Sequence, residues 1–176
     1  LVAAGVQAIV ICFVHAYVNP DHEQRAEAIA RKVWPHGFIT RSSDVLREIR
    51  EFERASAATL NAYIQPLMSR YLDRLNTTLQ QGGLEQDLLV MQGNGGMMSA
   101  PLAGVHAVQT VMSGPAAGAI AAARIAADAG FDNVLACDMG GTSFDLTLIR
   151  DRTPAMSTEK DMAYGVPLHI PMVDIH

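Results

Sequence analysis

The stretch CDMGGTSFD, residues Cys137 to Asp145, decides how the second half of the chain folds. The run NVLACDM (133–139) that leads into it and FDLTLIRD (144–151) that follows both have the composition of β-strands. Only a few residues join the two runs, so we expect an antiparallel hairpin. The tandem glycines Gly140 and Gly141 would form its turn.

The same glycines also suit a loop that binds phosphate. Glycines permit positive φ and, because they lack Cβ atoms, they let a ligand approach main-chain N–H groups. A turn of successive N–H donors makes an anion-binding nest, to which the hydroxyls of Thr142 and Ser143 would contribute. No Gly-Lys-Ser/Thr follows, so the loop is not of the Walker A type. The spacing alone does not separate the structural hairpin from the phosphate loop.

Two carboxylates flank the loop, Asp138 and Asp145. Like charges repel, so neither suits direct contact with a phosphate. They suit a site in which Mg²⁺ lies between protein and phosphates, with Asp138 as the metal ligand. An aspartate here would also orient an attacking water, which makes both residues candidate catalytic groups.

The remainder of the chain predicts an α/β fold with a mixed sheet and flanking helices. Residues 8–14 (AIVICFV) are typical of a buried strand, residues 21–34 of a helix and residues 37–45 of a second strand. This strand-helix-strand succession favours a mainly parallel arrangement.

A long helical pattern follows at residues 43–81, interrupted by Pro66, where we expect a kink or a break. Its apolar residues recur with helical spacing and predict one buried stripe. The stripe consists of Phe52, Ala55, Leu60, Tyr63, Leu67, Tyr71, Leu75 and Leu79. A strand at 87–92 and a small-residue helix at 107–129 then precede the hairpin.

Two further segments have both a structural and a ligand-binding interpretation. Asn94, Gly95 and Gly96 would contact substrate or nucleotide, or simply form a hairpin turn, for which Asn-Gly is a strong signal. Ser113 and Gly114 would begin the small-residue helix, with Ser113 as its N-cap. If that helix end points into a cleft, it would also hold a phosphate.

Composition excludes several classes of function. The 176 residues are 49% hydrophobic and carry a formal net charge of −5, so there is no basic footprint for nucleic acid or an anionic membrane. We find neither an apolar run of membrane-spanning length nor a secretion signal. Cys12 and Cys137 both lie in apolar, strand-like runs, which predicts two buried thiols and a cytoplasmic location.

Several of these motifs carry a resemblance to a known family. DMGGTSFDLTLI (138–149) resembles the second phosphate loop of the actin, heat-shock chaperone and sugar-kinase ATPase superfamily. Within it, five segments together resemble the hydantoinase A and 5-oxoprolinase family, which includes subunits of acetone and acetophenone carboxylases. These segments are HAYVNPDHEQRAEAI, EFERASAATLNAYIQPLMSRYL, QGNGGMM, SGPAAGA and CDMGGTSFD.

The resemblance implies a partial actin-like (ribonuclease H-like) ATPase fold that uses ATP and Mg²⁺. Residues 1–42 would end a first lobe, 43–83 would form a connecting helical region, and 84–176 would belong to a second lobe with the phosphate-binding hairpin. The implied reaction is ATP-driven opening of a cyclic amide or imide through a phosphorylated intermediate, together with a companion B-type subunit or domain. Alternatives are a subunit of an ATP-dependent ketone carboxylase and a chaperone-like ATPase.

The sequence also departs from the family pattern. An earlier phosphate loop and a later glycine-rich segment that contacts adenosine are both absent. We therefore expect this chain to be part of a longer protein and to hydrolyse little ATP by itself.

Overall fold

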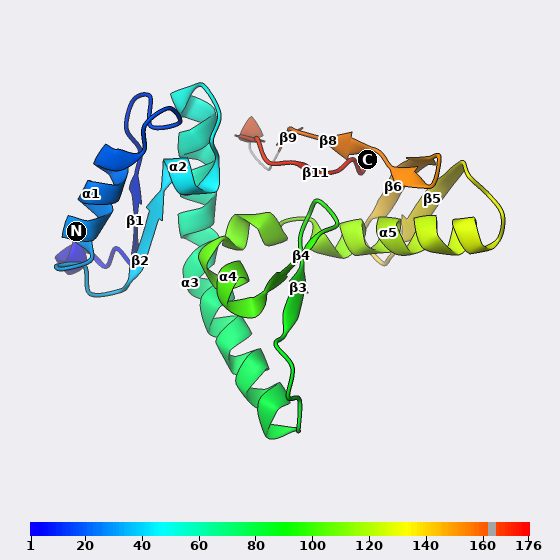
Figure 1. Cartoon of the computed structure of the whole chain (residues 1–176), viewed down its shortest axis with the longest axis horizontal. Coiled ribbons are helices and arrows are strands. Elements are labelled where there is room, and N and C mark those ends of the chain that lie inside the picture. The colour runs from blue at the N-terminus through cyan, green and yellow to red at the C-terminus, as the bar shows by residue number, and fades with distance from the viewer. Residues whose placement is uncertain (162–164) are drawn as a thin grey trace.

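The N-terminal residues form the β-α-β unit that the sequence predicts. In the computed structural model, which describes residues 1–161 and 165–176, β1 (Ala8–Ile11) pairs in parallel with β2 (Phe38–Arg41), and α1 (Asp21–Ala30) connects them. Both α1 and the long helix α3 (Glu51–Gln81) pack on this pair of strands, one on either side (Figure 1). A short 3₁₀ helix, η1 (Val2–Ala4), precedes β1.

The long helix is shorter than expected at its start and unbroken in its middle. The short helix α2 (Ser42–Val45) is separate from α3, and Arg50 between them has a φ of 81°. Because that left-handed conformation is incompatible with a continuous helix, the predicted start at residue 43 was wrong. α3 then runs through Pro66 without the break that the proline suggested.

The predicted buried stripe of α3 is largely exposed. Phe52, Tyr63, Leu67 and Tyr71 are 64%, 83%, 70% and 58% exposed, so this prediction was wrong for all four. The buried face instead carries small and polar residues: Arg54, Ala57, Ala58, Asn61, Ala62, Gln65, Pro66 and Leu72. Alanines let the neighbouring elements approach closely, and the polar side chains are buried because they find partners.

Asn61 shows how a polar residue enters this core. Its amide donates to the Thr40 hydroxyl at 3.1 Å and to the carbonyl oxygen of Val105 at 3.0 Å, and its carbonyl oxygen accepts the N–H of Val108 at 3.0 Å. The side chain thereby ties α3 to β2 and to the chain around α4 (Ala100–Val105) and η2 (Ala107–Thr110).

A second buried polar group joins α1, α2 and α3. The Glu23 carboxylate is fully buried and accepts hydrogen bonds from both the hydroxyl and the N–H of Ser43, from the Ser42 hydroxyl and from the N–H of Phe13. Burial alone raises the pKa of Glu23, but these hydrogen bonds outweigh burial and hold the pKa below its usual value. The Ser42 hydroxyl in turn accepts from the buried Arg54 guanidinium at 3.5 Å.

The second half of the chain contains the predicted hairpins. β3 (Leu89–Met91) and β4 (Met97–Ser99) form one, and β5 (Val134–Met139) and β6 (Phe144–Arg150) form the other, both antiparallel. β7 (Thr153–Pro154) adds to β6, and α5 (Ser113–Asp128) packs against this three-stranded sheet. In Figure 1, α5 lies alongside β5 and β6.

The C-terminal residues form two short ladders and return to both hairpins. β8 (Met156–Ser157) pairs with β11 (Met172–Val173), and β9 (Lys160–Asp161) pairs with β10 (Pro167–Leu168), both antiparallel. The N–H of Val173 donates to the carbonyl of Gly93 at 2.8 Å, and His176 exchanges two backbone hydrogen bonds with Leu146. Parallel and antiparallel pairing thus both occur, but within the described residues they occupy separate small sheets.

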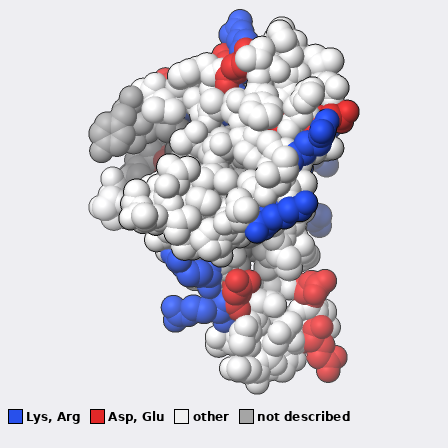
Figure 2. Space-filling view, turned by 90° about the vertical axis from the view of Figure 1, so that its left-hand side faces the viewer, with Lys and Arg blue, Asp and Glu red and all other residues white. Residues whose placement is uncertain are grey.

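The surface carries charges of both signs. On the face shown in Figure 2, lysines and arginines are interspersed with acidic residues, and large areas are uncharged. Among the described residues, the structure contains no helix with the length and apolar composition needed to cross a membrane.

Cys12 is half-buried and Cys137 is exposed, so the prediction of two buried thiols was wrong. Leu135 and Met139, which alternate with the pocket-facing residues of β5 as Cys137 does, are also exposed.

Candidate functional site

The hairpin places the two candidate carboxylates face to face. Asp138 on β5 and Asp145 on β6 are directly opposite in the ladder, so their side chains project from the same face of the sheet. That face packs against α5 and borders a pocket of about 190 Å³. The pocket is lined by Pro115, Gly118, Ala119 and Ala122 of α5, by Ala136, Cys137, Asp138, Asp145 and Thr147 of the hairpin, and by Ile175.

Small side chains on α5 create the space for this pocket. Four lining residues, from Pro115 to Ala122, recur at helical spacing and form one stripe of the helix. A Cβ atom on Gly118 would lie 3.9 Å from Oδ2 of Asp138, in ordinary contact. The helix backbone therefore lies close to the carboxylate.

The electrostatics of the pocket fit a hydrated divalent cation. Two carboxylates line it, while no lysine, arginine or histidine is among its lining residues. Mg²⁺ is commonly held by one or two carboxylates together with waters and substrate phosphates. Within the described part of the chain, no cluster of three His, Cys, Asp or Glu side chains could hold a metal by itself. The donor set therefore fits a metal shared with a ligand better than an all-protein metal site.

The loop at the tip of the hairpin is exposed from Gly140 to Ser143. The N–H of Gly140 donates to the carbonyl of Ser143 at 3.1 Å, which closes the turn. Within residues 1–161 and 165–176, the N–H groups of Gly141 and Thr142 form no hydrogen bond. The Ser143 hydroxyl donates to Oδ2 of Asp145 at 3.4 Å. The loop thus presents backbone donors beside the carboxylate pair.

The fold does not itself require glycine at either tandem position. Neither Gly140 nor Gly141 has a positive φ, contrary to one reason we gave for their presence. A Cβ atom built on either residue would meet nothing within 4 Å. Within the described residues, neither a positive φ nor a close contact accounts for the two glycines.

The Asn94–Gly96 segment is accounted for by structure. The Asn94 side-chain oxygen accepts the N–H of Gly96 at 2.7 Å, and Gln92 and Gly96 close the hairpin at 2.8 Å. Gly95 has a φ of 83°, and its Cβ would lie 2.9 Å from Cδ1 of Ile120. None of the three residues lines the pocket at Asp138, so the structure does not bring them into that site.

Ser113 and Gly114 lie at the start of α5, as predicted, but Ser113 is not its cap. The N-cap residue is Met112, in a left-handed conformation with a φ of 58°, and no side chain caps the helix. Pro115, one residue beyond Gly114, reaches the pocket, whereas Ser113 and Gly114 do not line it.

Sequence reasoning missed Gly118 and Thr147 as pocket residues, and Gly93 as a packing residue. The small-residue pattern of α5 indicated a close helix contact but not its partner. Gly93 lies in the β3–β4 hairpin and packs against the backbone of Val111. A Cβ atom at this position would lie 2.3 Å from the carbonyl oxygen of Val111.

Comparison with known proteins places these features in a family. Residues 54–176 match the family model described as hydantoinase/oxoprolinase, and residues 1–34 match its N-terminal region. The alpha subunit of caprolactamase from Pseudomonas jessenii is 39% identical over 93% of this chain and 24% of its own length. The 5-oxoprolinase of Saccharomyces cerevisiae is 31% identical over 100% of the chain and 13% of its own length.

Solved structures agree with these matches. The ATP-dependent caprolactamase from Pseudomonas jessenii superposes with a TM-score of 0.83 and 38% identity over 99% of this chain and 25% of its own. Nucleotide-free acetone carboxylase superposes with a TM-score of 0.84 and 28% identity over 100% of this chain and 25% of its own. The chain spans about a quarter of the length of these structures. By sequence and by fold, it belongs to the hydantoinase/oxoprolinase family.

Proposed function

We propose that this chain forms part of the phosphate-binding site of a longer, ATP-dependent enzyme that opens cyclic amides. The observation that carries this proposal is the pair Gly140 and Gly141, for which neither conformation nor packing requires glycine, next to two facing carboxylates. Such a loop leaves backbone N–H groups open to phosphate oxygens. Family membership supports ATP use, because the related caprolactamase and acetone carboxylase structures are described as ATP-dependent.

The residues divide the work between binding and positioning. The N–H groups of Gly141 and Thr142, with the hydroxyls of Thr142 and Ser143, would bind phosphate oxygens. Asp138 would hold Mg²⁺, which supplies neutralisation of phosphate charge when bound. Asp145 would hold the Ser143 hydroxyl toward the site and orient water. Five further residues were predicted to bind the nucleotide: Asn94, Gly95, Gly96, Ser113 and Gly114. Because none of them lines the pocket at Asp138, they would have that role only if the bound nucleotide extends beyond this pocket.

Phosphorylation would solve a chemical problem of the substrate. An amide carbonyl is a poor electrophile, and its oxygen is a poor leaving group. Transfer of the γ-phosphoryl group to that oxygen forms an O–P bond and releases ADP. Water would then add to the ring carbon, and the carbon–nitrogen bond would break as the nitrogen takes up a proton, which leaves an acyl phosphate. A second water would hydrolyse this acyl phosphate to the carboxylate and inorganic phosphate. The loop donors would stabilise the charge that develops on the transferred group.

Two observations bear on the substrate and partner. Identity to the caprolactamase subunit, at 39%, exceeds the 30% to the acetone carboxylase beta subunit of Xanthobacter autotrophicus, which favours a cyclic amide over a ketone. Both relatives are named as subunits, so we propose a companion B-type subunit as partner. A ketone carboxylase is the alternative, supported by the TM-score of 0.84.

The test is Mg²⁺-ATP hydrolysis by the complete protein with its companion subunit. Caprolactam, hydantoin, 5-oxoproline, and acetone with bicarbonate are each added to separate assays. We expect one cyclic amide to stimulate turnover and Asp138→Asn to reduce it by roughly 100-fold or more. The matched control is Asp128→Asn, which removes an exposed carboxylate of α5 that is paired with Arg124.

Stability measurements make the result interpretable. Removing one of two facing carboxylates relieves repulsion, so the unfolding midpoint of Asp138→Asn should equal or exceed that of the wild type. Stimulation only by acetone with bicarbonate would establish the carboxylase alternative. Unchanged turnover in Asp138→Asn would show that the hairpin is structural.

A further inference from the structure

Thr147 is a further polar residue of the pocket at Asp138 and Asp145. It lies on β6 two residues beyond Asp145, so the two side chains project from the same face of the sheet. Thr147 lines the pocket beside α5, and its ladder partner on β5 is Ala136. Among the described residues that line this pocket, Thr147 alone carries a hydroxyl group. The binding roles proposed above involve the two carboxylates but not this hydroxyl.

The Thr147 side chain is buried without a hydrogen-bond partner. The residue is 5% exposed, and within the described chain its hydroxyl forms no hydrogen bond. The other buried polar residues that the structure describes, from Glu23 to Gln65, all form side-chain hydrogen bonds. A buried hydroxyl without a partner costs stability, so native proteins usually supply a partner from protein, water or ligand. The pocket is the space from which such a partner can reach Thr147.

The spacing of the polar groups favours a water as this partner. Residues two apart on a strand have Cα atoms about 7 Å apart, and diagonal neighbours on adjacent strands are about 7–8 Å apart. Asp145 and Asp138 have these two relations to Thr147. Within the described chain, Asp145 accepts a side-chain hydrogen bond only at Oδ2, from Ser143, so Oδ1 is available. A water between Oδ1 and the Thr147 hydroxyl would span the separation that a direct hydrogen bond of about 2.7 Å does not.

A water of a hydrated cation suits these two groups. Such a water binds the metal through its oxygen and directs both protons outward, so it needs two hydrogen-bond acceptors. A carboxylate oxygen is one acceptor, and a threonine hydroxyl accepts as well as donates. Mg²⁺ dehydrates reluctantly and usually keeps several of its waters. Thr147 and Asp145 together therefore offer the acceptors that one of these waters requires.

We propose that Thr147 is a positioning residue for the cation, because its hydroxyl and Asp145 accept the two protons of one water in the cation's hydration shell. The inference rests on the proposed function, since it takes the pocket at Asp138 to be the Mg²⁺ site. Removal of an outer-shell partner of this kind typically lowers metal affinity or activity by about 10–100-fold.

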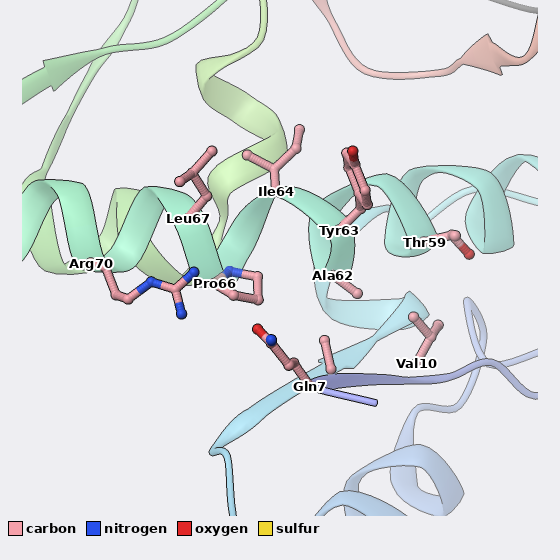
Figure 3. A pocket seen from close by; sticks show the side chains of 10 residues that line it. Gln7, Val10, Thr59, Ala62, Tyr63, Ile64, Pro66, Leu67 and Arg70 are labelled. Carbon is pink, nitrogen blue, oxygen red and sulfur yellow. The ribbon is translucent and has the colours of Figure 1, made fainter. Parts of the chain in front are cut away.

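A second threonine shows why burial beside carboxylates matters. Thr59 lines a groove of about 580 Å³ between β1 and α3, which is shown in Figure 3. Thr59 is exposed, and no aspartate or glutamate is among the described residues that line this groove. Solvent therefore reaches the Thr59 hydroxyl directly, and the groove offers a cation no carboxylate. Thr147 differs in both respects.

Thr147→Val and Thr147→Ser test the proposal in the complete protein with its companion subunit. Valine keeps the branched shape and removes the hydroxyl, whereas serine keeps the hydroxyl. Calorimetric titration measures the binding of adenylyl imidodiphosphate, a non-hydrolysable ATP analogue, first in EDTA and then in Mg²⁺. We expect Mg²⁺ to tighten binding in the wild type and in Thr147→Ser, and this gain to be roughly 10-fold smaller or less in Thr147→Val, with binding in EDTA unchanged. An equal gain in Thr147→Val and the wild type would overturn the proposal.

Thermal unfolding without metal or nucleotide provides an independent measurement. Because valine removes an unpaired hydroxyl, the unfolding midpoint of Thr147→Val should equal or exceed that of the wild type. The matched control is Thr40→Val, since Thr40 is 4% exposed but its hydroxyl accepts from Asn61 at 3.1 Å and donates to Gln65 at 3.5 Å. Thr40→Val should lower the midpoint and leave the effect of Mg²⁺ unchanged. A lower midpoint in Thr147→Val would show that its hydroxyl has a structural partner and would overturn the proposal.

Asp138→Asn separates this proposal from the proposed function. Loss of the Mg²⁺ effect in Asp138→Asn but not in Thr147→Val would support the phosphate site and refute the role of Thr147. An unchanged Mg²⁺ effect in both variants would contradict the proposed function itself. Loss of the effect in both, with the wild-type effect retained in Thr147→Ser, is the expected result.

Discussion

The β3–β4 and β5–β6 hairpins both turn at glycines, but for different reasons. In the β3–β4 hairpin, Gly95 needs a left-handed φ of 83°, and Gly93 lies so close to Val111 that a Cβ would be 2.3 Å from its carbonyl oxygen. In the β5–β6 hairpin, Gly140 and Gly141 have neither requirement. The fold therefore accounts for the first set of glycines but not for the second, for which we propose a bound phosphate as the reason. Only structure could separate the two motifs.

The largest effect that tests this comparison is expected at Gly93. In Gly93→Ala, the new methyl group collides with the Val111 carbonyl, and the backbone must move away from its hydrogen bonds to Gln109 and Val173. Overpacking of this kind costs about 3 kcal/mol of unfolding free energy. Urea unfolding measures it. A cost as small as that of an alanine at Gly140 would remove the distinction between the hairpins.

A second prediction compares the hairpin carboxylates with Glu23. Asp138 and Asp145 face each other, whereas the Glu23 carboxylate accepts four hydrogen bonds in the core. Glu23→Gln should cost about 2 kcal/mol at neutral pH, because it replaces an oxygen acceptor with a donor that faces other donors. Urea unfolding at pH 7 gives this value.

The pH dependence of the same variant sharpens the comparison. The pKa of Glu23 is lowered in the folded state, so its ionisation stabilises the fold above the ordinary value of 4.5, and this stability is lost as the pH falls through the folded pKa. The free energy of unfolding of the wild type should therefore decrease below pH 4.5, and that of Glu23→Gln should decrease less. Parallel acid profiles would show that other groups control acid stability.

A smaller effect is expected at Gly95. Alanine there must adopt a left-handed conformation, but the nearest atom is the flexible end of Ile120, which can move. The strain should cost roughly 1 kcal/mol. Differential scanning calorimetry of Gly95→Ala beside Gly93→Ala would rank the two costs, and the reverse order would show that Val111 yields more easily than Ile120.

The smallest stability effect is expected at Gly140, where the functional effect should be large. Alanine meets nothing and needs no unusual φ, so Gly140→Ala should be neutral or stabilising by about 0.4–1 kcal/mol. Its methyl group would nevertheless enter the space of a bound phosphate, and we expect ATP affinity in the complete protein to fall by roughly 10-fold, measured by calorimetric titration. A stable variant that binds ATP as well as the wild type would refute the loop assignment.

Local patterns predicted much of this fold. The β-α-β unit and the β5–β6 hairpin follow from local signals, whereas the direct pairing of Asp138 with Asp145 was found in the structure. The buried face of α3 did not, because helical periodicity reveals stripes but not which stripe packs. Asn61 lies in the core since Thr40, Val105 and Val108 satisfy it, and those partners come from distant segments.

The candidate site could likewise be predicted only in part. Its carboxylates and glycine loop could be found in one stretch of sequence. The opposite wall, with Gly118 and Ala119, depends on how α5 docks against the hairpin, which is a tertiary contact. The role of Gly93 likewise depends on the carbonyl of Val111, which a different element brings into contact.

The length of α3 has a consequence for how the chain folds. Its 31 residues contact β1, β2 and α2, which precede it, and α4, η2 and β10, which follow it. A helix forms locally within about a microsecond, whereas contacts between distant segments must first close long loops. α3 is therefore expected to serve as the folding nucleus onto which both flanking regions condense. The exposed side chains of Tyr63 and Leu67 would then be open to aggregation during synthesis.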